Sequence, residues 1–145
     1  LQGRGISSVL AWEDDFLPEG LPGALRAAGI ALSSRYDPAD ELGGASAYPA
    51  GLTGAAAGVA ETGSLVIPAG EGRLPAASLM PRIHLAVLYA RHLLPSVRAA
   101  LALPVVRQAP AVSLITGPSR TSDIEMTQTT GMHGPGEVHV FLLEA

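Results

Sequence analysis

The sequence predicts an α/β fold: an open, mostly parallel sheet with flanking helices and a small β-hairpin insertion. Short runs rich in Val, Ile and Leu alternate along the chain with helical segments, and strands separated by helices pair in parallel through right-handed crossovers. Hydrophobic residues make up 48% of the chain and aromatic residues only 4%, so the core must be aliphatic. Such an interior is typical of parallel sheets that are buried on both faces.

The first part of the chain predicts a strand, a helix and a second strand. Residues 6–12 form a short apolar run that is typical of a buried strand. Pro22 near the first helical position and Gly29 just past the last one bracket a helix. Residues 30–34 predict the next strand, and residues 38–45 predict a weak helical segment.

A Gly- and Ala-rich stretch over residues 51–58 leads into a predicted hairpin. Residues 58–67 indicate two short strands joined at Glu61-Thr62-Gly63-Ser64, since a Thr-Gly junction between apolar runs favours a tight turn. Ser122 and Glu125 stand in the spacing of a capping box, which predicts a helix beginning near Ser122. The further expected elements are a turn or helix at 74–80, a strand at 84–89, a helix at 95–102, a strand at 111–116, that capped helix at 122–128 and a last strand at 137–143.

Length and charge limit the domain count and the function classes. The 145 residues predict one domain over 1–145. A net charge of −4 with scattered arginines and few aromatics argues against nucleic-acid binding. No apolar run approaches the ~20 residues of a membrane span, and Leu1-Gln2-Gly3-Arg4 does not resemble a signal peptide, so we expect a cytoplasmic protein. The start almost directly before a predicted strand suggests that an N-terminal part of the natural protein is missing here.

The sequence has no cysteine and four histidines. The absence of cysteine excludes thiolate nucleophiles and any iron–sulfur cluster that this stretch would hold through cysteine. The histidines lack the short paired spacings of a zinc site, and no acidic calcium loop occurs. We therefore expect no metal and no cofactor in this chain.

The loop after the strand at 111–116 is a candidate anion site. The candidate binders are at the end of the strand and directly after it, at Thr116, Gly117, Ser119, Arg120 and Thr121. Backbone amides, hydroxyls and a guanidinium converge there, where a carboxylate or phosphate could bind. Arginine suits a carboxylate because its planar fork donates two hydrogen bonds. The alternative is an ordinary turn in which the hydroxyls make local hydrogen bonds and Arg120 lies in solvent.

Four ordered blocks carry a family resemblance. These are Gly51-Leu52-Thr53-Gly54-Ala55 with Val59-Ala60-Glu61-Thr62-Gly63-Ser64-Leu65-Val66, then Leu79-Met80-Pro81-Arg82-Ile83-His84-Leu85-Ala86-Val87, then Gly117-Pro118-Ser119-Arg120-Thr121-Ser122-Asp123-Ile124-Glu125, then His133-Gly134-Pro135-Gly136-Glu137-Val138-His139-Val140-Phe141-Leu142-Leu143. Together they resemble the LUD domain family, in its lactate-utilization protein C branch. Residues 1–50 are similar to the family only in their strand-helix-strand pattern, and members are usually longer, with helices before the first strand.

The resemblance implies a fold similar to the NagB, ribose-5-phosphate isomerase and CoA-transferase group. It also implies a role in the conversion of L-lactate to pyruvate, together with an iron–sulfur subunit and a second cysteine-rich subunit. Clusters would then belong to the partners, which agrees with a chain that has no cysteine. Whether this subunit is itself an enzyme stays open.

Two further groups of residues are candidates for the site. Glu61, with Thr62 and Gly63, could act as a base or nucleophile in a fold similar to the CoA-transferases; the alternative is a turn residue whose oxygens cap nearby amides. His133 lies in a predicted loop and could titrate near neutral pH. His139 alternates with valines in a predicted strand, which favours a structural histidine.

Two function classes follow from these residues. In the first, the chain is a non-redox subunit that binds a small carboxylate or phosphorylated ligand, or docks an iron–sulfur partner. In the second, it is a stand-alone isomerase or CoA-transferase type of enzyme that uses Glu61 and the Arg120 loop. An enzyme needs those two residues within one substrate length in a closed pocket, whereas a docking subunit should expose a broad apolar patch.

Overall fold

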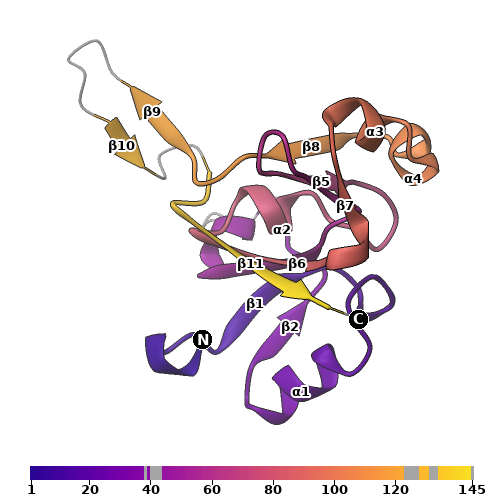
Figure 1. Ribbon diagram of the computed structural model, residues 1–145. Coiled ribbons are helices and arrows are strands. Elements are labelled where there is room, and N and C mark those ends of the chain that lie inside the picture. The colour runs from indigo at the N-terminus through magenta and orange to yellow at the C-terminus, as the bar shows by residue number, and fades with distance from the viewer. Residues whose placement is uncertain (38, 40–43, 123–127, 131–133, 145) are drawn as a thin grey trace.

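The centre of the molecule is a five-stranded sheet in which every neighbouring pair is parallel (Figure 1). The computed structural model describes residues 1–37, 39, 44–122, 128–130 and 134–144. The strand order is β11-β6-β3-β1-β2. The bounds are Ser8–Ala11 for β1, Ala31–Ser33 for β2, Ala50–Gly54 for β3, Ile83–Tyr89 for β6 and Glu137–Leu143 for β11. This confirms an α/β fold with a mostly parallel sheet.

Among the described residues between 2 and 79, two α-helices and three 3-10 turns flank or join the strands. Helix α1, Leu21–Ala27, connects β1 to β2 and covers one face of the sheet near these two strands. Helix α2, Ala76–Leu79, packs on β3 and β6. The 3-10 turns are η1 at Gln2–Arg4, η2 at Asp14–Phe16 and η3 at Gly44–Ala47. Of the weak helix expected at 38–45, residues 38 and 40–43 lie outside the described residues.

A second, four-stranded sheet packs against the first, on the side away from α1 (Figure 1). Its order is β7-β4-β5-β8, with bounds Leu93–Leu94, Ala57–Val59, Ser64–Pro68 and Val112–Ile115. Strands β4 and β5 form the predicted antiparallel hairpin. The expected small insertion is thus half of a larger sheet, since β7 pairs with β4 and β8 pairs with β5.

The second sheet has a core on each face. Leu65 and Ile67 of β5 join the main core beneath the parallel sheet, whereas Val66 points the other way, into a smaller core. That smaller core is closed by α3, Val97–Leu101, and α4, Pro104–Gln108, which follow the 3-10 turn η4, Ala90–His92. Because successive side chains of β5 point to opposite faces, this one strand contributes to both cores and joins the two halves of the molecule.

Strand β3 is a difference from the sequence prediction, which did not assign a strand to the Gly- and Ala-rich stretch. Small residues have weak β-propensity, so the local pattern does not reveal the strand. Packing against α2 explains why the residues are small. A Cβ added at Gly51 would lie 1.7 Å from the carbonyl oxygen of Ala77 in α2. Glycine is needed there because the α2 backbone lies directly on the strand.

The capped helix predicted from Ser122 to Gln128 is wrong at both ends. Ser122 ends strand β9, Arg120–Ser122, and Gln128 begins strand β10, Gln128–Thr130, which pairs with β9 in an antiparallel hairpin. Residues 123–127, with Asp123 and Glu125 of the expected capping box, lie outside the described residues. A capping box contributes only about 1 kcal/mol, and the threonines of both strands favour extended pairing. The hairpin projects from the body (Figure 1).

Within the described part of the chain, no helix is long and apolar enough to cross a membrane.

Candidate functional site

A line of three hydroxyls joins the β4–β5 hairpin to the loop after β8. The Oγ1 of Thr62 lies 2.7 Å from the Oγ of Ser64, which lies 2.7 Å from the Oγ1 of Thr116. Ser64 is buried, whereas Thr62 and Thr116 are exposed. This hydroxyl line (Thr62, Ser64, Thr116) places two separate blocks of sequence side by side. Its last member, Thr116, is the first residue of the predicted anion loop and is followed by Gly117.

The anion loop is held at the amino end of the parallel sheet. The Ser119 N–H donates to the carbonyl oxygen of Pro135 (2.8 Å), and the N–H of Gly136 donates to the carbonyl oxygen of Arg82 (2.9 Å). Arg82 directly precedes β6, and Gly136 directly precedes β11. The loop, the turn before β6 and the turn before β11 thus lie together. These are three of the four blocks that the sequence singled out.

The remaining predicted residues of the loop are more open. Arg120 begins strand β9 and is exposed, so its guanidinium lies in solvent as the turn interpretation expects. Thr121 lies in the same strand. His133 lies outside the described residues.

Glu61 caps a helix. Its Oε1 accepts a hydrogen bond of 2.9 Å from the backbone N–H of Val97, the first residue of α3. Ser96 caps the same helix, since its Oγ accepts from the Ala99 N–H at 3.2 Å. Gly63 closes the hairpin turn with a φ of +66° and a hydrogen bond of 2.8 Å from its N–H to the Val59 carbonyl oxygen. These contacts match the turn-residue interpretation of Glu61.

Two histidines have contrasting environments. His84 is fully buried, and its Nε2 lies 2.9 Å from the Oγ1 of Thr53. Burial lowers the pKa of His84 to about 4, so the imidazole is neutral at pH 7. His139 is half-exposed, with its Nε2 3.0 Å from the Oε2 of Glu137. Hydrogen bonds from His139 and then Arg4 lower the pKa of the Glu137 carboxyl.

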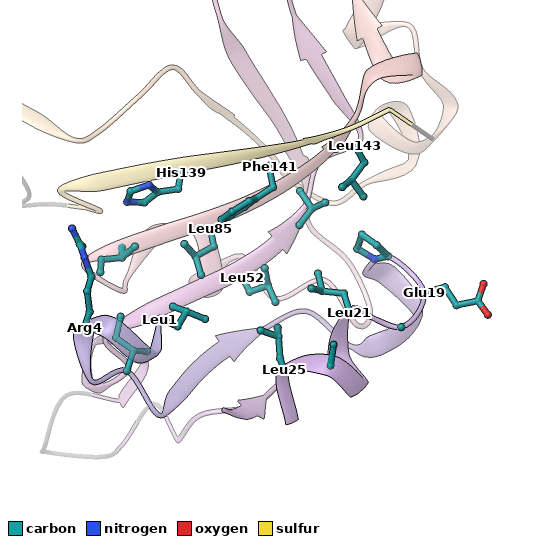
Figure 2. Close-up of a pocket in the computed structure, with 16 residues that line it drawn as sticks. Leu1, Arg4, Glu19, Leu21, Leu25, Leu52, Leu85, His139, Phe141 and Leu143 are labelled. Carbon is teal, nitrogen blue, oxygen red and sulfur yellow. The ribbon is translucent and has the colours of Figure 1, made fainter. Parts of the chain in front are cut away.

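An apolar groove of about 610 Å³ lies over the face of the parallel sheet that α1 only partly covers (Figure 2). We call it the sheet groove. Strand β11 contributes His139, Phe141 and Leu143, which point into the groove opposite Leu21 and Leu25 of α1. Its other lining residues are Leu1, Arg4, Ile6, Pro18, Glu19, Gly20, Ala24, Leu52, Ile83, Leu85 and Val87.

Strand β11 borders the groove and forms an open edge of the sheet. It pairs with β6 on one side and with no strand of the described chain on the other. Val140, Phe141 and Leu142 are 49%, 52% and 53% exposed. Sequence reasoning missed this surface, because a strand that is apolar on both faces predicts burial on both faces. The strand order, which no local pattern reveals, leaves it at the edge.

Comparisons with known proteins agree with the four sequence blocks. Residues 44–143 match the family model described as the LUD domain. Lactate utilization protein C from Shouchella clausii (strain KSM-K16) is 30% identical over 139 residues, which cover 90% of this chain and 60% of that protein. The protein of the same name from Macrococcus caseolyticus (strain JCSC5402) is 30% identical over 142 residues, with 93% and 61% covered.

Two further comparisons bear on family and fold. The uncharacterized protein YkgG from Escherichia coli (strain K12) is 31% identical over 119 residues, covering 75% of this chain and 51% of that protein. The crystal structure of a DUF162 family protein from Deinococcus radiodurans aligns with a TM-score of 0.54 at 18% identity, covering 95% of this chain and 88% of that chain, which shows a shared fold. The chain spans about 60% of the length of the first curated relatives above.

Proposed function

This chain belongs to the LUD domain family, and we propose that it serves as a subunit in the oxidation of L-lactate to pyruvate, together with iron–sulfur partner subunits. The observation that carries the proposal is the open apolar edge at β11. The names of the relatives, Lactate utilization protein C, support the metabolic context. This stretch contains no cysteine, so in the proposal the cysteine ligands of a cluster lie outside these 145 residues.

The β11 edge has the properties of a docking surface. An open strand presents unpaired N–H and C=O groups, to which a strand of another protein can add. The apolar side chains of Val140, Phe141 and Leu142 are about half exposed, and a partner that packs on β11 would cover them. The sheet groove continues the apolar surface from β11 to α1. We propose that an iron–sulfur subunit packs on the β11 edge and the sheet groove.

A small carboxylate or phosphorylated ligand is the second part of the proposal. Gly117, Ser119, Arg120 and Thr121 would bind it, with Thr62 and Gly63 nearby and His133 in the adjacent segment. The hydroxyl line supports this grouping, because it connects Thr62 to the residue before Gly117. An exposed guanidinium at the end of such a loop is free to donate two hydrogen bonds to a carboxylate.

The alternative is a stand-alone enzyme of the isomerase or CoA-transferase type, in line with the expected similarity to the NagB and ribose-5-phosphate isomerase group. In it, Glu61 would be the base or nucleophile and Arg120 would hold the substrate. The hydrogen bond from Val97 to Glu61 favours the docking subunit instead, since it gives the carboxylate a structural role. Neither Glu61 nor Arg120 lines the sheet groove.

Co-purification under reducing, anaerobic conditions tests the docking proposal. We expect the native chain to retain the cysteine-rich subunits and Val140→Lys to lose them, because a charge on the edge strand opposes strand addition. Leu101→Lys is the matched control, since Leu101 is 49% exposed on α3 and far along the chain from β11. Equal retention by all three proteins, or a native monomer that ignores these subunits, would contradict the proposal. A dimer of the chain alone in sedimentation velocity, lost in Val140→Lys, would show that a second copy covers the edge instead.

Ligand-dependent thermal stabilisation tests the anion loop. Lactate, pyruvate, CoA and inorganic phosphate are each added to the native chain, to Arg120→Ala and to Arg107→Ala, an exposed arginine of α4. We expect at least one of these compounds to raise the Tm of the native chain and of Arg107→Ala but not of Arg120→Ala. If none shifts the native chain, or Arg120→Ala shifts equally, the loop is not the site.

A further inference from the structure

A second cavity, of about 590 Å³, lies at the carboxyl ends of three neighbouring parallel strands. Trp12 follows β1, Ala55 and Ala56 follow β3, and Tyr89 ends β6; all four line it. We call it the strand-end cavity. It lies at the opposite end of the parallel sheet from the anion loop, which adjoins the turns before β6 and β11.

The strand order of the parallel sheet makes the strand-end cavity a candidate ligand site. From β1 the chain moves to β2 on one side, then returns to β3 on the other side of β1 and continues outward through β6 to β11. The order of the strands therefore reverses between β1 and β3. In open α/β sheets, ligands bind outside the carboxyl ends of the strands at such a reversal. The strand-end cavity occupies that position.

We propose that the strand-end cavity binds an organic monocarboxylate with an apolar body, whose carboxylate is held by Arg73. This inference is independent of the docking at β11 and of the anion loop. No residue of the β11 edge or of the anion loop lines the strand-end cavity, and of the residues that line the sheet groove only Pro18 and Val87 do.

The backbone holds Arg73 in place before any ligand arrives. Gly70 and Arg73 exchange two backbone hydrogen bonds, of 3.3 and 3.0 Å, which close a tight turn. The Glu13 N–H donates to the Gly72 carbonyl oxygen (2.9 Å) and ties this turn to the segment after β1. Gly72 has a φ of +71°, and a Cβ there would lie 2.3 Å from the Phe16 ring, so only glycine fits.

Arg73 has no ion-pair partner among the residues that the structure describes. Its guanidinium lies over the Phe16 ring, 5.3 Å from the centroid, and no described carboxylate forms an ion pair with it. Its Nε is shielded from solvent and has no hydrogen-bond partner among the described residues, and the same holds for Nδ1 of His92, which also lines the cavity. Polar groups buried in this way are normally paired. A carboxylate in the cavity would reach the terminal nitrogens of Arg73, because an Nε that is closed to solvent is closed to the ligand as well.

The other residues of the cavity select the kind of anion. Asp15 also lines it and opposes a second negative charge, which favours a monoanion over a phosphate dianion. The remaining wall is mainly apolar, with Trp12, Leu17, Val87, Leu103 and Val105 among its members. A volume of this size suits a ligand larger than a three-carbon acid. An aromatic or aliphatic chain attached to the carboxylate would cover the wall.

Calorimetric titration with 3-phenylpropanoate tests the proposal, with the neutral 3-phenylpropanamide as the matched ligand. We expect saturable binding of the carboxylate to the native chain and at least tenfold weaker binding of the amide. Arg73→Met should weaken binding of the carboxylate at least tenfold. Ala56→Phe, which fills the cavity and leaves Arg73 in place, should weaken it as well. Arg107→Met, at an exposed arginine of α4, should bind like the native chain, and circular dichroism verifies that each variant is folded.

Three results would overturn the inference: no saturable binding at millimolar 3-phenylpropanoate, equal binding of the carboxylate and the amide, or native affinity in Arg73→Met. A loss of binding in Arg120→Ala with native affinity in Arg73→Met would move the carboxylate to the anion loop. Because the docking proposal is tested by Val140→Lys and partner retention, its failure would leave the result of this titration unaffected.

Discussion

At the scale of single residues, the buried His84 makes the stability of the fold depend on pH. Burial holds its pKa at about 4, whereas in the unfolded chain it titrates near its ordinary value of 6.5. The unfolded state therefore takes up a proton as the pH falls through 6.5, and the folded state does so only near 4. Stability is retained above pH 6.5 and falls between those two values.

We expect this titration to lower the free energy of unfolding by about 2 kcal/mol between pH 7.5 and pH 5.0. Urea unfolding at both pH values measures it. His84→Gln should remove most of this pH dependence, and His139→Gln, which changes a half-exposed histidine, should keep it. An unchanged pH dependence in His84→Gln would show that another group is responsible.

Ser64 is the central residue of the hydroxyl line and connects two predicted parts of the site. Ser64→Ala should lower the free energy of unfolding by about 1 kcal/mol, because both neighbouring threonine hydroxyls lose a buried partner. Thr62→Ser keeps its hydroxyl and should unfold at nearly the native urea concentration. Equal midpoints for Ser64→Ala and the native chain would mean that the hydroxyl line contributes nothing to stability.

At the scale of secondary-structure elements, the contact of α2 with β3 depends on one glycine. Gly51→Ala places a methyl group against the Ala77 carbonyl oxygen, so the helix or the strand must move. We expect a loss of about 3 kcal/mol or more in the free energy of unfolding. Gly23→Ala in α1 is the control, because a Cβ there meets nothing within 4 Å. It should gain about 0.5–1 kcal/mol from helix propensity. Similar effects of the two substitutions in thermal unfolding would contradict the close packing.

The elements that the sequence predicts correctly are those with a strong local signal. The apolar strands β1, β6 and β11 and the helix bracketed by Pro22 and Gly29 are confirmed. Strand β3 is not visible locally, because its small residues are explained only by a helix that packs on them. Strands β9 and β10 are missed because the capping-box spacing at Ser122 favours a helix, whereas the structure pairs Arg120–Ser122 with Gln128–Thr130 as an antiparallel hairpin.

At the scale of the whole molecule, the strand order separates three surfaces. The anion loop adjoins the turns before β6 and β11, the strand-end cavity lies at the opposite end of the same sheet, and the apolar edge runs along β11. Sequence blocks predict that the hairpin at Thr62 and the loop at Gly117 belong together, and the hydroxyl line joins them. Neither the cavity nor the edge is predictable from these blocks, because both depend on which strands are neighbours.

We propose that β11 is the surface through which this chain joins iron–sulfur partners. Amide hydrogen exchange of the chain alone and after addition of the iron–sulfur subunits under anaerobic conditions tests it directly. We predict that amides of Glu137–Leu143 that face away from β6 exchange more slowly in the complex, while those of α3 are unchanged. A complex in which these β11 amides exchange as fast as in the chain alone would contradict the claim.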